Sequence, residues 1–146
     1  MIGDLFKRLL QPEPEPLDEM DARLALTALL VRLARSDGYY AASEIMRIEK
    51  IVMARFGLSH DAAAALRTDA EKVEAEAPDT VRFTRAIKDA VPYEDRVGVV
   101  EALWQVALAD DERDHHEDAL VRLVSSLLGV SDMDSARARQ RVSGAT

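Results

Sequence analysis

In the stretch LARSDGYYAASEIMRIEK, residues 33–50, an apolar helical run ends at an Asp and a short polar segment follows. A Glu then begins a second apolar run. The stretch VALADDERDHHEDALVRL, residues 106–123, repeats this order further along the chain. One shift aligns both acidic pairs and matches Asp37 with Asp110 and Glu44 with Glu117. We call residues 37–44 and 110–117 the first and second acidic junctions, and predict one helix–turn–helix unit written twice.

Outside the junctions, apolar residues recur at helical spacing and no long stretch alternates as a strand would. Gly57 and Gly129 follow apolar runs, where glycine can end a helix, and Ser59 and Ser131 can cap the helix that follows. The expected helices cover residues 17–36, 41–56, 60–76, a segment capped by Asp79 or Thr80 and broken at Pro92, 93–109, 114–128, and a last one that starts at 131 or 132. We predict an all-α fold, a compact bundle of about seven helices built from two pseudo-repeated halves.

Residues 1–16 differ from the rest of the chain. MIGDLFKRLL, residues 1–10, forms a short amphipathic arm, and QPEPEP, residues 11–16, reads as a Pro-rich linker. The arm can dock on its own domain, dock on a partner or lie on a membrane surface, and its pattern is not that of a secretory signal. We expect one helical domain over residues 17–146, cytoplasmic or peripheral to the inner face of the membrane.

The amino-acid composition limits the classes of function that fit the chain. The chain has 27 acidic and 19 basic residues and a net charge of -8, which disfavours binding to nucleic acid and favours cations and basic partners. It has no Cys, which excludes disulfides and thiolate metal sites. No Ser-His-Asp set and no Gly-rich phosphate loop is visible. We therefore expect a protein without catalytic residues, and place Trp104 in the core or at a partner contact.

The junction motifs resemble those of the TerB family, the helical domain associated with tellurite resistance. The matching residues are Ala34 to Gly38 with Glu44, Ala107 to Asp110 with Glu117, and the closures at residues 56–59 and 128–131. The resemblance covers residues 17–142, with Asp111 in place of the usual Gly. It implies a binding module that acts in tellurite or general stress response through protein contacts, including a membrane-associated complex. It also implies that the paired acidic motifs form a divalent-cation site.

The residues themselves allow two interpretations of the acidic junctions. If the two copies fold against each other, Asp37, Glu44, Asp110 and Glu117 can converge, and calcium or magnesium prefers such oxygen ligands. Alternatively, each Glu occupies the third helical position, where it caps the helix and is favoured by the helix dipole. Ala41 would then be the N-cap residue of the helix that carries Glu44, and Asp114 that of the helix that carries Glu117.

These interpretations lead to different functions. The first is a module whose protein contacts respond to a divalent cation, and the second is a cation-independent adaptor. A third alternative is a metal-assisted hydrolase that uses the same carboxylates with His115 or His116. A calcium-binding EF-hand loop is excluded, because its twelfth position, counted from Asp110, is Val121 instead of Glu.

Overall fold

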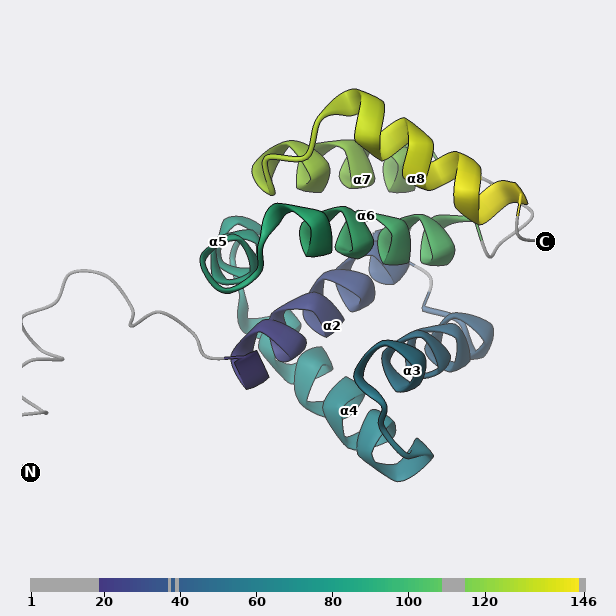
Figure 1. Ribbon diagram of the computed structural model, residues 1–146. Coiled ribbons are helices and arrows are strands. Elements are labelled where there is room, and N and C mark those ends of the chain that lie inside the picture. Colours follow the sequence, from purple (N-terminus) through teal and green to yellow (C-terminus); the bar gives the residue numbers. More distant parts are fainter. Residues whose placement is uncertain (1–18, 37, 39, 109–114, 145–146) are drawn as a thin grey trace, which may run out of the picture.

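The computed structural model describes residues 19–36, 38, 40–108 and 115–144 (Figure 1). This part of the chain contains α-helices and no strand, so the all-α prediction is confirmed. The helices are α2 (Glu19–Arg35), α3 (Ala42–Phe56), α4 (His60–Glu76), α5 (Val81–Ala90), α6 (Tyr93–Ala107), α7 (His115–Leu127) and α8 (Asp132–Gly144). None of these helices is long and apolar enough to cross a bilayer. The predicted arm and linker, residues 1–16, lie outside the described residues.

Helix α2 is the centre of the bundle. It contacts α3, α4, α5, α6 and α7, and Figure 1 shows it enclosed between α3 and α4 on one side and α6 on the other. Its residues are buried on almost every face because Ala and Leu alternate along it and let neighbouring helices approach closely. The fully buried residues are Thr27, Ala28, Leu30, Val31, Leu33 and Ala34. The helix therefore anchors the core that the apolar spacing of residues 17–36 predicts.

Helix α6 forms the second support of the core. It packs on α2 with one side, and α7 and α8 cover its opposite side (Figure 1). Val100, Leu103 and Val106 of α6 are buried in the same apolar cluster as Leu29 and Leu30 of α2. Burial of side chains of this size stabilises the fold by about 1.5–3 kcal/mol each. The result is a single core shared by all seven described helices.

Local signals set the helix ends where the sequence predicts them. Ser59 accepts a hydrogen bond from the N–H of Ala62 (3.2 Å), and Ser131 accepts one from the N–H of Asp134 (3.1 Å). Gly57 has φ 63°, in the left-handed region that ends α3. Each side-chain cap satisfies a backbone donor that the helix leaves without a partner, which contributes about 1 kcal/mol.

The two halves follow the same order of elements. In each, a long helix leads to a second helix, a glycine with positive φ follows (Gly57 or Gly129), and a third helix packs back on the first. Helix α5 has no counterpart after α8 among the described residues. That the bundle is built from two pseudo-repeated halves stays a prediction.

Candidate functional site

The structure describes two of the four predicted cation ligands, Glu44 and Glu117. Their side chains are only 7% and 3% exposed, and they lie in the first turns of α3 and α7. A buried carboxylate is costly unless hydrogen bonds or opposite charges compensate it. Asp37 and Asp110 lie outside the described residues, as do the side chains of His115 and His116.

The helices that carry the junctions share a direction. Helices α2 and α6 contact each other and run toward the same end of the bundle, and α3 and α7 both begin at that end (Figure 1). The two buried glutamates therefore belong to helices that start on the same side of the core. However, α3 and α7 make no contact with each other within the described ranges. Nor does that part of the chain bring three or more potential metal-ligating side chains together.

Glu44 has the capping contact that its position predicts. Ala41 is the N-cap residue of α3, and its backbone N–H donates a 3.1 Å hydrogen bond to Glu44 Oε1. The negative carboxylate also lies at the positive end of the helix dipole. Glu117 occupies the matching place in the first turn of α7, while its predicted N-cap residue, Asp114, is outside the described residues.

The first acidic junction is attached to α4 through residues before it and within it. Before the junction, Arg32 and Arg35 bind the carboxylate of Glu74, with N–O distances of 3.1 and 2.6 Å. Within it, the hydroxyl of Tyr40 donates a 2.7 Å hydrogen bond to Glu71 Oε2. The Arg35 guanidinium lies over the Tyr40 ring at 4.9 Å, so the end of α2 and the junction also touch each other.

A second arginine on α4 extends this network to α3. Arg67 donates to Glu49 (3.0 Å) and to Glu71 (2.9 Å), and so neutralises the carboxylate that Tyr40 binds. Burial, and then the hydrogen bond to Glu71 and its charge, raise the pKa of Tyr40 well above the usual tyrosine value. The hydroxyl therefore keeps its proton and its role as a donor. The sequence pattern did not predict these ion pairs, which join three different helices.

Trp104 is 3% exposed, so its predicted place in the core is confirmed. The sequence did not indicate that its indole N–H would donate a 3.3 Å hydrogen bond to the Ser135 hydroxyl across the α6–α8 interface. Nor did it indicate that both residues line a cavity. These residues are about thirty positions apart, and only the packing of two helices brings them together.

Comparison with known proteins extends the structural picture. The fold is similar to a crystal structure of a protein of unknown function from Porphyromonas gingivalis W83, with TM-score 0.64 and 21% identity, over 86% of this chain and 96% of that one. At this identity the likeness concerns the fold alone. No curated protein matches the chain significantly. The family model described as tellurite resistance protein TerB matches residues 23–140, which is most of the chain. The chain therefore belongs to the TerB family.

Proposed function

We propose that the chain is a non-catalytic binding module whose protein contacts respond to a divalent cation at the acidic junctions. The role would lie in tellurite or general stress response, as its family suggests. The partner would be another protein, including one of a membrane-associated complex. Residues 1–10 would supply any membrane contact, and that part of the proposal rests on their amphipathic pattern alone.

One observation carries the cation proposal. Two buried carboxylates, Glu44 and Glu117, occupy the same position in two helices that begin at the same end of the bundle. Capping alone does not require a glutamate to be buried, because an exposed one satisfies the helix end equally well. Burial of a carboxylate is offset when it shares a cation with other oxygen ligands. Asp37 and Asp110 would be those partners.

The proposed response follows from electrostatics. If the four carboxylates converge, they would repel one another in the absence of a cation, and calcium or magnesium would remove this repulsion. The junctions would then adopt a closer arrangement and present a different surface to a partner. Such a switch requires that the cation bind one arrangement more tightly than the other.

A cation-independent adaptor is the second candidate, and the hydrogen bond from Ala41 to Glu44 favours it. This bond accounts for one carboxylate oxygen without any ligand. The hydrolase alternative has less support, because neither Glu44 nor Glu117 lines either of the two best-formed cavities of the described structure. A hydrolytic site needs a concave pocket beside its carboxylates.

Calorimetry separates the two candidates. Calcium and magnesium are titrated into the wild type, into the double variant Glu44→Gln plus Glu117→Gln, and into Glu94→Gln. Glu94 also lies in the first turn of its helix but is exposed, so its substitution is the matched control. We expect binding in the wild type and the control, and its loss in the double variant. Absence of heat with either cation at about 1 mM, the level of weak extracellular calcium sites, would favour the adaptor.

A further inference from the structure

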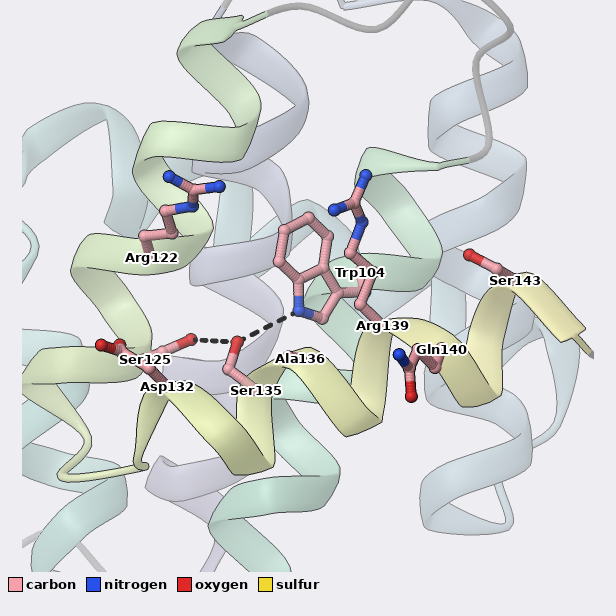
Figure 2. Close-up of a pocket in the computed structure, with 9 residues that line it drawn as sticks. All are labelled: Trp104, Arg122, Ser125, Asp132, Ser135, Ala136, Arg139, Gln140 and Ser143. Carbon is pink, nitrogen blue, oxygen red and sulfur yellow. Dashed lines mark hydrogen bonds between the residues drawn. The ribbon is translucent and has the colours of Figure 1, made fainter.

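A cavity of about 610 Å³ opens between α6, α7 and α8 (Figure 2). Its volume falls within the range of small-molecule sites. Trp104 of α6, Arg122 and Ser125 of α7, and Ser135 and Arg139 of α8 line it. Of the predicted cation ligands, the two that the structure describes, Glu44 and Glu117, are not among the residues that line this cavity.

The wall of the cavity contains a hydroxyl whose proton lacks a strong acceptor. Ser125 donates its own proton to the carbonyl oxygen of Val121 at 2.7 Å. Because that proton is used, Ser135 is the donor in its 3.4 Å pair with Ser125, while its oxygen accepts from the Trp104 indole N–H. A 3.4 Å O–O distance is long for a hydroxyl hydrogen bond, which normally measures about 2.7–2.8 Å. Ser135, 6% exposed, can therefore donate to a ligand better than to its present neighbour.

Two arginines supply positive charge. Figure 2 shows Arg122 and Arg139 on opposite sides of the Trp104 indole, and the Arg139 guanidinium lies over the ring at 5.2 Å. Within the described residues, neither guanidinium forms an ion pair with a carboxylate. By contrast, Arg137 and Arg141 on the same helix as Arg139 are paired with Asp134 and Glu101. Both guanidinium groups therefore remain available to bind an anion at this cavity.

The local charge favours an anion despite the acidic surface. Asp132 is the one carboxylate among the residues that line the cavity, against the two arginines. Charges further away act weakly, since salt at physiological strength screens them over about 8 Å. Guanidinium groups bind carboxylates and phosphates through two parallel hydrogen bonds, so each arginine can hold one such group.

We propose that this cavity binds a small polyanion, a molecule with at least two carboxylate or phosphate groups. One anionic group pairs with Arg122 and another with Arg139. The hydroxyl of Ser135 donates to a ligand oxygen, and the indole N–H behind it keeps that hydroxyl oriented. Its lining includes neither Glu44 nor Glu117, and the proposal does not depend on the proposed cation response.

The only tryptophan of the chain lines the cavity, so its fluorescence and its single indole N–H NMR signal report on the site directly. Citrate and pyrophosphate are titrated separately into the full chain at constant ionic strength. Excess EDTA keeps divalent cations away, so a failed cation proposal leaves this test intact. We expect a saturable shift of both signals with one or both probes. A response to citrate alone identifies carboxylates as the ligand groups, and a response to pyrophosphate alone identifies phosphates.

The variants Arg122→Gln and Arg139→Gln should each weaken binding about tenfold or more, because each removes a charge-assisted pair. Arg137→Gln is the matched control, since this arginine lies on the same helix, is 63% exposed and does not line the cavity. Its affinity should stay within about twofold of the wild type. The proposal is overturned if neither probe shifts the indole signal up to about 10 mM, which corresponds to binding weaker than about 3 kcal/mol. Equal weakening by all three substitutions would also overturn it, because it would show attraction to net charge alone.

Discussion

The hydroxyl of Tyr40 donates a 2.7 Å hydrogen bond to Glu71, and this contact attaches the middle of the first acidic junction to α4. Arg35, which precedes the junction, is attached to Glu74 of the same helix. The junction and the end of α2 before it are therefore held by carboxylates less than one helical turn apart on α4. Any rearrangement of the junction has to keep these contacts or break them.

Tyr40→Phe should lower the free energy of unfolding by about 1–2 kcal/mol, because the variant loses a hydrogen bond to a charged, half-buried acceptor. Urea denaturation followed by circular dichroism measures this as a lower midpoint with an unchanged slope. Tyr93→Phe is the control: the Tyr93 hydroxyl also binds a carboxylate, that of Asp134 at 2.6 Å, but at an exposed position. A loss as large in Tyr93→Phe would contradict a special role for the Tyr40 contact.

The raised pKa of Tyr40 predicts a loss of stability at alkaline pH. In the unfolded chain a tyrosine releases its proton near pH 10, whereas the folded protein holds that of Tyr40 to higher pH, owing to burial and to Glu71. The stabilisation is therefore complete below about pH 10 and is lost as the pH rises above it. The wild type should lose more stability than Tyr40→Phe between about pH 9 and pH 11. Parallel pH profiles for the two proteins would refute this assignment.

Glu74→Gln should destabilise the fold by about 1–3 kcal/mol, since both Arg32 and Arg35 lose their carboxylate partner at a site only 11% exposed. Thermal unfolding at neutral pH provides the measurement. Glu76→Gln, an exposed substitution of the same kind on the same helix, should change the stability by less than about 0.5 kcal/mol. If raised salt abolished the difference between the two variants, the Glu74 contacts would behave as an ordinary surface pair.

Gly57→Ala should cost about 1–2 kcal/mol, because an alanine Cβ is strained at φ 63°. No atom lies within 4 Å of the added Cβ, so the cost is conformational and not steric. Gly144→Ala provides the contrast, since that glycine is helical and its added Cβ is equally free of neighbours. We expect this second substitution to be neutral or slightly stabilising in the same denaturation experiment.

Leu30→Ala should destabilise the protein by about 2–5 kcal/mol, because the side chain is fully buried and its removal leaves a cavity in the shared core. Leu123→Ala removes the same atoms at a site 51% exposed and should cost less than about 1 kcal/mol. Comparison of the two midpoints tests whether α2 holds the core as its burial indicates. Similar costs at both sites would show that it does not.

Much of the fold could be predicted from local sequence. The apolar spacing around Leu30 and Leu103 identifies the two central helices, because a helix presents every third and fourth residue on one face. Ser59, Ser131 and Gly57 mark helix ends through contacts made within a few residues of each. These signals are local in the chain, so one sequence is sufficient to interpret them.

The arrangement of the sites could not be predicted in the same way. The sequence indicates that Glu44 and Glu117 occupy matching positions, but whether α3 and α7 touch depends on how both pack against α2 and α6. The pairs Arg32–Glu74 and Trp104–Ser135 join residues more than thirty positions apart. Polar partners that lie this far apart in the sequence follow no periodic pattern. Only the packing of the folded helices determines which residues pair.

The central position of α2 has a consequence for how the chain is made. This helix is synthesised before the other described helices, yet α3, α4, α5, α6 and α7 together cover it. A ribosome-bound chain that ends before α6 still exposes one apolar face of α2 to its surroundings. We expect the growing chain to engage chaperones until that face is covered, so that the earliest of the described helices is among the last to be enclosed.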